Sequence, residues 1–265
     1  MRRKRAVFGV LLVGALPAFP SHSLDLEAIN MRGTLRVIAA EGVQPEEFSF
    51  QEGGNPGFER EMVEGFARLQ QLKIEVIRVK NWDERIPTLL RGDGDVIVGL
   101  TETEARRKLI DFTAETIPTR NVVVSHVPHS RVNTVDDLRK EQVGVLKGSS
   151  WAQAAVDAGV LPSRIDSFDE LALLLEALKR GRVGATVMSV SDFTLAAKRN
   201  TGLQAGAFLG PPGHQAWGIR KEDKELAKAM SAYIKNLRRT SSWSRLIIKY
   251  FGEEALRVLG RAADQ

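Results

Sequence analysis

The stretch DVIVGLTETEARRKLIDFT, from Asp95 to Thr113, decides the fold. It opens with the apolar residues Val96, Ile97 and Val98, which are typical of a buried strand. Within a few residues it changes to threonines and then to the consecutive cations of residues 106–108. In α/β sheets, ligands bind outside the carboxyl ends of the strands. The stretch therefore predicts a core strand that ends at the edge of a binding cleft, with hydroxyl groups and positive charge close to that edge.

The N-terminus has the layout of a cleaved secretory signal. A basic start, MRRKR, is followed by the apolar stretch Ala6 to Leu16 and by small residues up to Ser23. An apolar stretch of this length is too short to cross a bilayer. We therefore expect residues 1–23 to be a signal peptide cut after Ser23, and the mature protein to be periplasmic.

The composition argues against several classes of protein. The chain has 38 Lys and Arg residues against 33 Asp and Glu residues, but four of the cations lie in the expected signal peptide. The mature chain is then almost neutral, so we expect no nucleic-acid partner. Cysteine is absent, and the four histidines lack the spacing of metal ligands. We accordingly expect no disulfide, no metal site and no cofactor.

Strand and helix patterns alternate through the rest of the chain, which is typical of an α/β fold. Apolar runs predict strands at 33–40, 74–79, 95–101, 121–127, 142–146, 182–188 and 216–221, and helical spacing predicts helices at 58–69, 82–92, 134–138, 149 onward, 168–181, 222 onward and around 243–252. In the helix 58–69, Phe58, Met62, Phe66 and Leu69 form one apolar stripe. Thr134 and Asp137 have the spacing of a capping box.

Six stretches resemble, in sequence order, the family 3 extracellular solute-binding proteins, the group that includes polar amino-acid binding proteins of ABC importers. They are GTLRV (33–37), FSFQEGGNPGFEREMVEGFA (48–67), VKNWDERIPTLLRGDGDVIVGLTETEARRKLIDFT (79–113), TVDDLRKEQVGVLKGSS (134–150), GRVGATVMSVSDFTLAAK (181–198) and WGIRKEDKELAKAMSAYIKNL (217–237). The likeness covers nearly all of residues 33–252. Its most specific part is the opening stretch, which resembles the family motif GxTxTxxRxxxxDFS.

The resemblance implies a two-lobed, flytrap-like periplasmic-binding-protein fold of type II. Lobe one would hold residues 30–119 together with 214–265, and lobe two residues 120–213, with strands at NVVVSHV (121–127) and GHQAWGI (213–219) crossing between them. The implied function is capture of a small carboxylate-bearing solute, an amino acid or a related compound, by hinge closure. The implied partner is an ABC permease in the inner membrane, and the family expectation is a monomer. On this basis we expect a binding protein and not an enzyme.

Matched to the family motif, Arg106 would be the carboxylate clamp and Thr101 its companion, with Gly99 at the same edge. A guanidinium suits this role because it binds a carboxylate through two parallel hydrogen bonds. We expect the neighbouring Arg107 and Lys108 to lie on a solvated helix face.

The turn KGSS, at 147–150, is the second expected anion-binding element. A glycine turn that leads into a helix presents backbone NH groups and hydroxyls to an anion. The resemblance implies that Ser149 and Ser150 contact the ligand from lobe two, although an ordinary N-cap would look the same. For Phe48 and Trp82, we expect contact with the ligand in lobe one, and core packing is the alternative.

One position departs from the family pattern. Members that bind amino acids usually have an aspartate at the end of the lobe-two strand, where it takes the ligand's α-ammonium, and here that position is Ser189. A hydroxyl accepts a hydrogen bond but supplies no charge. Asp192 lies three residues on, in expected helix, and could replace the aspartate only through a local shift. Otherwise Glu41, Glu46 or Glu47 could face the cleft, unless their loop is simply solvated.

Two other functions stay open on the sequence. Cyclohexadienyl dehydratases share the implied fold, and a cleft glutamate such as Glu41 or Glu46 with a raised pKa could serve as a general acid. Membrane-bound lytic transglycosylases carry a similar module in front of a catalytic domain, which we do not expect here because only 13 residues follow KYFG. The remaining alternative is a ligand-sensing accessory protein that works without a transporter.

Overall fold

A computed structural model describes residues 25–253 and 255. The expected signal peptide therefore lies outside the described residues. Within the part that is described, no helix is both long enough and apolar enough to span a bilayer.

The strands of the described chain form one mixed sheet in the order β2-β1-β3-β8-β4-β7-β5-β6. Their bounds are β1 Thr34–Ala40, β2 Lys73–Val79, β3 Val96–Thr101, β4 Asp111–His126, β5 Val143–Leu146, β6 Ile165–Phe168, β7 Ala185–Ser189 and β8 Leu203–Ile219. At one end β1 pairs in parallel with β2 and β3, and at the other end β5 pairs in parallel with β6 and β7. Parallel neighbours require crossover connections, which the helices between them supply.

The helices pack on both ends of this sheet. They are α1 Asp25–Arg32, α2 Phe58–Leu69, α3 Arg85–Leu90, α4 Glu104–Arg107, α5 Val135–Leu138, α6 Ser150–Asp157, α7 Leu171–Lys179, α8 Val190–Arg199, α9 Lys224–Arg238 and α10 Ser241–Phe251, with short 3-10 turns η1 Trp82–Glu84 and η2 Pro162–Arg164. The predicted apolar stripe of α2 is buried except for Leu69, which is exposed at the end of the helix. Only the N-cap half of the predicted capping box is present: the backbone NH of Asp137 donates to Thr134 Oγ1 at 3.1 Å, while the Asp137 carboxylate accepts from the Thr134 hydroxyl instead of from its backbone NH.

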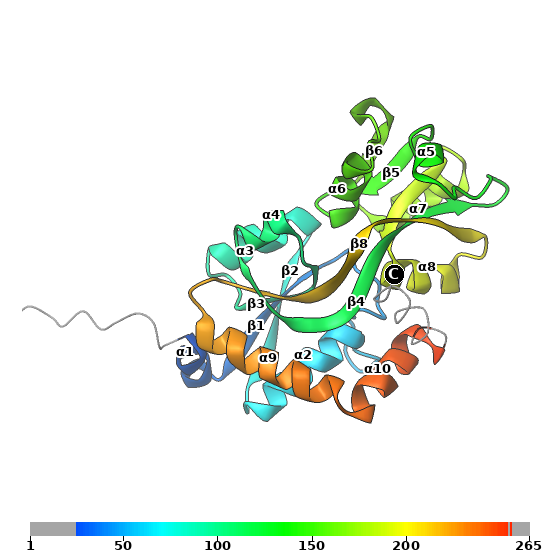
Figure 1. The fold of residues 1–265 in the computed structure, drawn as a ribbon. Coiled ribbons are helices and arrows are strands. Elements are labelled where there is room, and N and C mark those ends of the chain that lie inside the picture. Colours follow the sequence, from blue (N-terminus) through cyan, green and yellow to red (C-terminus); the bar gives the residue numbers. More distant parts are fainter. Residues whose placement is uncertain (1–24, 254, 256–265) are drawn as a thin grey trace, which may run out of the picture.

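Two long antiparallel strands, β4 and β8, lie side by side at the centre of the sheet and connect its two halves (Figure 1). At one end β8 pairs with β3, where Gln215 lies opposite Thr101. At the other end β4 pairs with β7, where Asn121 lies opposite Ser189. The arrangement is the two-lobed periplasmic-binding-protein fold of type II that the sequence predicts.

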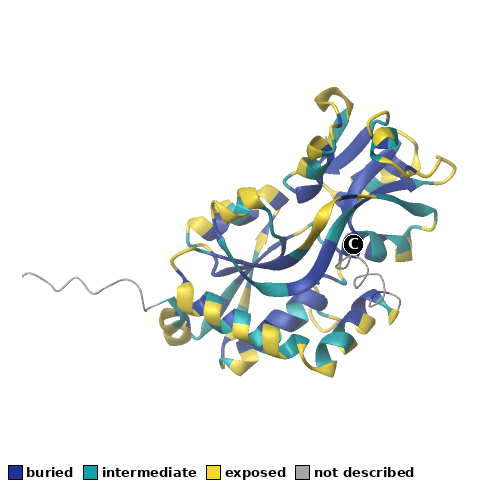
Figure 2. Cartoon of the chain, in the orientation of Figure 1, coloured by how far each residue is buried: buried dark blue, intermediate teal, exposed yellow. Residues whose placement is uncertain are grey.

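Below, the first lobe means α1 to α4 with β1 to β3 and the C-terminal helices α9 and α10, and the second lobe means α5 to α8 with β5 to β7. The proposed chain boundaries at 119/120 and 213/214 stay a prediction. In both lobes inner strands such as β3 and β7 are buried, whereas the edge strand β2 is partly exposed, and the outer faces of the helices are exposed (Figure 2). The carboxyl ends of β3 and β7 both meet the crossing strands, so residues at these two ends approach one another.

Candidate ligand-binding site

Cavities lined by both lobes lie along their junction. One of about 920 Å³ runs beside the crossing strands, and a separate one of about 520 Å³ lies between the loop after β1 and the start of α7. The larger cavity is rich in hydroxyl and amide groups, and its lining includes Thr101, Thr103, Arg106, Thr119, Asn121, Ser149 and Ser150. The hydroxyl of Thr119 is buried and has no hydrogen-bond partner among the described residues.

Arg106 links the two lobes. Its helix, α4, begins at the N-cap Thr103, whose hydroxyl accepts the backbone NH of Arg106. From there the guanidinium reaches back: Nη1 donates to Thr101 O at 2.6 Å and Nη2 donates to Gly148 O at 3.1 Å. Burial lowers the pKa of Arg106 to about 10, so the side chain stays cationic at neutral pH. By contrast Arg107 and Lys108 are exposed.

The second lobe meets the first at the turn that contains Gly148. The residue has φ of +70°, and a Cβ placed on it would lie 2.5 Å from the backbone nitrogen of Asp83 in the first lobe. Ser149 is the N-cap of α6: its hydroxyl accepts the NH of Trp151 at 3.2 Å and donates to Leu146 O at 2.5 Å. Its predicted contact with a ligand stays a prediction, as does that of Ser150, the buried first residue of the helix.

Aromatic side chains pack across the junction. The rings of Trp82 from the first lobe and Trp151 from the second have centroids 5.9 Å apart. Trp82 is 9% exposed, and its indole Nε1 is buried without a hydrogen-bond partner in the described chain. Phe48 lies deeper, packed at 5.2 Å against Phe50 in the core of the first lobe. Ligand contacts by Trp82 and Phe48 stay predictions.

Ser189 ends β7 and caps α8. Its hydroxyl accepts the NH of Asp192 at 3.0 Å and donates to Asp192 Oδ2 at 2.5 Å. This pair of bonds turns the carboxylate of Asp192 toward the first lobe, where the amide of Gln44 donates to Asp192 O at 3.0 Å and to Oδ1 at 3.4 Å. Asp192, in the first turn of α8, therefore reaches the junction from the second lobe. The bonds to the cap residue Ser189 orient its carboxylate, and the helix does not need to shift.

The three glutamates of the loop after β1 have different surroundings. Glu41 lines the smaller cavity, and Glu46 forms an ion pair with Arg199 of the second lobe. Glu47 is buried beside β3: a Cβ placed on Gly99, whose φ is +60°, would lie 2.6 Å from Glu47 Oε1. The glycine at the end of β3 therefore gives the Glu47 side chain its room.

Arg85, which the sequence analysis did not single out, is almost fully enclosed at 2% exposure. It begins α3, its Nε donates to Trp82 O at 3.2 Å, and its guanidinium lies 4.6 Å from the centroid of the Trp82 ring. The sequence gives little signal for it, because an arginine that follows Asp83 and Glu84 looks like one charge on a solvated helix face.

Glu47, Arg85, Arg106 and Asp192 thus place two cations and two carboxyls at the junction. Burial raises the pKa of Glu47 well above its ordinary value, and the charges of Asp192 and Glu59 raise it further. Burial lowers the pKa of Arg85 to about 9, and the nearby positive charge of Arg106 acts in the same direction. Burial also raises the pKa of Asp192, against the hydrogen bonds from Ser189 and Gln44.

In the described chain, no salt bridge within 4.0 Å joins any two of these four side chains, although their charges influence one another. Buried charges are costly unless they are paired and hydrogen-bonded. The arrangement suits a small molecule that carries charges of both signs and can pair with both kinds of group at once.

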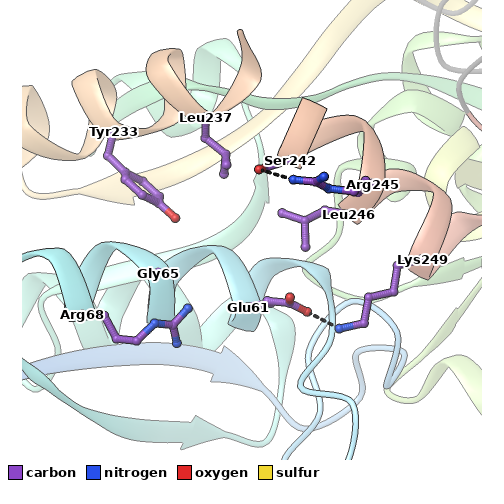
Figure 3. A pocket seen from close by; sticks show the side chains of 9 residues that line it. All are labelled: Glu61, Gly65, Arg68, Tyr233, Leu237, Ser242, Arg245, Leu246 and Lys249. Atoms are coloured by element: carbon purple, nitrogen blue, oxygen red, sulfur yellow. Dashed lines mark hydrogen bonds and ion pairs between the residues drawn. The ribbon is translucent and has the colours of Figure 1, made fainter. Parts of the chain in front are cut away.

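A third cavity, of about 320 Å³, lies outside the junction, between α2, α9 and α10 (Figure 3). Lys249 pairs with Glu61 across this cavity at 2.6 Å, and Arg245 donates to the hydroxyl of Ser242 at 3.0 Å. Unlike the junction, this cavity holds paired groups, and the cations along it are exposed.

Comparison with known proteins agrees with this geometry. The family model described as "Bacterial extracellular solute-binding proteins, family 3" matches residues 35–253, which confirms the resemblance drawn from the sequence. A mutant of ArgBP from T. maritima, a protein also known in an arginine-bound form, has a similar structure, with a TM-score of 0.78, 26% identity and coverage of 86% of this chain and 100% of that one. The ancestral amino acid-binding protein AncCDT-1, a precursor of cyclohexadienyl dehydratase, gives a TM-score of 0.76 at 25% identity, covering 85% and 99%.

Among curated proteins, the chain is similar to membrane-bound lytic murein transglycosylase F of Stutzerimonas stutzeri, with 28% identity over 94% of this chain. The chain spans about half the length of the curated relatives it matches, 53% in this case. These relatives are named as enzymes, and AncCDT-1 is named as the precursor of one. The prediction that the protein is not an enzyme is therefore wrong: proteins similar to this chain include some that are named as enzymes.

Proposed function

Because the chain belongs to the bacterial extracellular solute-binding proteins of family 3, we propose that it captures a small ligand with a carboxylate and an amino group between its lobes. The observation that carries the proposal is a set of four charged side chains, the buried Glu47, Arg85 and Asp192 and the half-buried Arg106. Both lobes contribute to the set, and no salt bridge joins its members in the described chain.

The carboxylate end of the ligand is assigned to Arg106. A guanidinium has five N–H donors, and Arg106 uses two of them on backbone carbonyls. Arg106 lines the larger cavity together with Thr101 and Ser150, whose hydroxyls can add to the remaining donors. Gly99 of the first lobe leaves room for the side chain of Glu47. Ser149 of the second lobe caps α6.

The amino end is assigned to Asp192, with Glu47 beside it. In this proposal the aspartate of the usual family position is replaced by Asp192, which Ser189 holds in place. The negative charge that a hydroxyl could not supply is then present after all. This restores an amino-bearing ligand to the candidates.

Ligand binding and lobe closure would then be one event, because the residues for the two ligand ends come from different lobes. The family membership favours a role in which the closed, ligand-loaded protein delivers its ligand from the periplasm to an ABC permease. A sensing role without a transporter uses the same closure. Stimulation of a co-expressed permease's ATPase activity by the loaded protein separates the two roles.

The test is thermal unfolding of the protein purified after export, with each standard amino acid and with carboxylates that lack an amino group. A ligand at about 100 times its Kd adds roughly 2.7 kcal/mol, a rise in Tm of roughly 5–10 °C. Arg106→Ala removes charge-assisted hydrogen bonds and should weaken binding about 10- to 100-fold. The control is Arg91→Ala, which removes an exposed cation of the same lobe whose partner, Asp93, is also exposed. Equal effects of the two variants, or stabilisation only by acids without an amino group, would count against the proposal.

A second candidate function is periplasmic catalysis of the cyclohexadienyl dehydratase type, and the observation that favours it is Glu47. A buried carboxyl with a raised pKa can hold a proton for a leaving group, and cationic side chains nearby can bind a carboxylate substrate. Turnover of prephenate or arogenate by the wild type, lost in Glu47→Gln, would support it. Absence of turnover with intact amino-acid binding would leave the first proposal alone.

A further inference from the structure

We propose that Arg85 and Trp82 form a second anion-binding subsite beside Arg106, and that the ligand is a compact amino dicarboxylate with the charges of an acidic amino acid. The inference rests on the proposed function, because it takes the same junction as the binding site. It adds the chemical class of the ligand's side-chain group, which is a second carboxylate.

Arg85 has unused hydrogen-bonding capacity in an enclosed place. Of its five N–H donors only Nε–H has an acceptor in the described chain, the carbonyl of Trp82. With 2% exposure the side chain has little access to water. A guanidinium in this position is stabilised by a group that accepts two parallel hydrogen bonds, and a carboxylate does so.

Trp82 adds a second donor from the same turn of chain. Its Nε1–H is buried and without a partner among the residues described. The turn η1 leads directly into α3, so Trp82 and Arg85 are fixed relative to each other by the Nε bond and by the stacking of the guanidinium on the ring. Contact of the Trp82 ring with Trp151 puts this pair at the lobe junction. One turn therefore presents several free donors, which favours an acceptor-rich group.

The acceptors nearby are less available than these donors. Asp192 Oδ2 accepts from Ser189 and its Oδ1 accepts from Gln44. Glu47 has no hydrogen-bond donor to its carboxyl in the described chain, and burial together with two other carboxyls raises its pKa, which favours the neutral form. Glu59 is fully enclosed in the first lobe, where Trp217 and Thr116 donate to it.

With Glu47 neutral, Arg85, Arg106 and Asp192 leave one net positive charge at the junction. A ligand with two carboxylates and one ammonium carries one net negative charge and balances it. The other possible role of Arg85 is that of a counter-ion for Glu47 and Asp192. In that case both acids are ionised, and the junction accepts a neutral or cationic amino acid equally well or better.

The experiment is isothermal titration of the exported protein with L-aspartate, L-glutamate, their amides L-asparagine and L-glutamine, and L-arginine. Each acid and its amide differ by one charge at nearly equal size. We expect the preferred acid to bind at least roughly 10-fold more tightly than its amide, the size of a charge-assisted interaction. Arg85→Gln should remove most of this preference, with little effect on the amide. Arg91→Gln removes an exposed cation at the end of the same helix, paired with the exposed Asp93, and is the control that should leave both affinities unchanged.

The results separate the inference from the function on which it rests. Equal affinity for acid and amide, or a preference for L-arginine, overturns the second subsite while a loss of binding in Arg106→Ala still supports the proposed function. Absence of binding by every amino acid overturns both. If Arg85→Gln does not fold, Trp82→Phe decides, because it removes the indole N–H and keeps an aromatic ring. It should lower affinity for the acid severalfold more than affinity for the amide.

Discussion

Replacement of Gly148 by alanine should separate lobe closure from folding. Gly148 lies in the turn of the second lobe that touches Asp83 of the first. Two costs arise from the added methyl group. The backbone at φ +70° disfavours any L-residue, whatever the position of the lobes, whereas the collision with Asp83 exists only when the lobes are together.

The structure gives a magnitude for each cost. A left-handed conformation costs an alanine about 1–2 kcal/mol, and this applies equally to open and closed forms. The new Cβ would lie 2.5 Å from the Asp83 nitrogen and 2.9 Å from its Cα, so backbone atoms must move. Overpacking of this kind typically costs about 1–3 kcal/mol, which corresponds to a loss of ligand affinity of roughly 5- to 150-fold.

The assay is a pair of measurements on Gly148→Ala and on Gly181→Ala. Gly181 has the same φ of +70°, but a Cβ there meets nothing within 4 Å. Both variants should lose similar stability in urea denaturation, and only Gly148→Ala should lose affinity in titration calorimetry. Tryptophan fluorescence adds a direct readout, because Trp82 and Trp151 approach each other across the junction. Equal Kd values for the two variants would refute the idea that this contact forms as the ligand is bound.

Further predictions concern the buried carboxyls and their caps. The pKa of Glu59 is raised by burial to about 7, above its ordinary value of 4.5, so its contribution to stability is complete below about pH 4.5 and is lost as the pH rises through 7. Glu59→Gln should therefore flatten the decline in unfolding free energy between pH 5 and 8 by on the order of 1–3 kcal/mol, measured by urea denaturation. Glu47 and Asp192, whose pKa values burial also raises, should contribute to the decline that is left. Ser189→Ala should cost about 1 kcal/mol of stability and also weaken amino-acid binding, since Asp192 loses its hydrogen bond. Thr134→Ala, which removes the cap of the short helix α5, should cost stability alone, and an equal effect of both variants on Kd would contradict this role of Ser189.

Much of the fold could be predicted because strands such as β1 and β3 are apolar runs between clear turn signals. The edge strand β6 was not predicted, because its sequence IDSF is short and half polar. The crossing strands were recognised only in part. The first half of β4 contains buried threonines, such as Thr116, whose hydroxyl donates to Glu59 at 3.0 Å, and these interrupt the apolar pattern. The first half of β8 contains glycines and two prolines, which indicate turns when read locally. Long-range pairing with β4, irregular at several points, holds this segment extended nevertheless.

The site was predictable where a local motif fixes it and obscure where burial depends on the other lobe. The motif led to Arg106, and the glycine turn led to Ser149, which lie on opposite sides of the junction as expected. Arg85 is enclosed and packed on the ring of Trp82, which no local sequence pattern indicates. Glu46 and Glu47 are adjacent and identical in type, yet one pairs outward with Arg199 and the other turns inward beside Gly99.

The buried charges also bear on why a ligand should be needed for stable closure. When the lobes separate, water can solvate Arg85 and Asp192, and bringing the lobes together removes that water at a cost of several kcal/mol per ion. Direct contacts across the junction, such as Arg106 to Gly148 O at 3.1 Å, offset part of this cost. A ligand with complementary charges can offset the rest, and it shifts the population toward closure only by its difference in affinity for the two forms. We infer that the same unpaired charges that select the ligand also keep the empty protein from holding its closed form, so that closure reports occupancy.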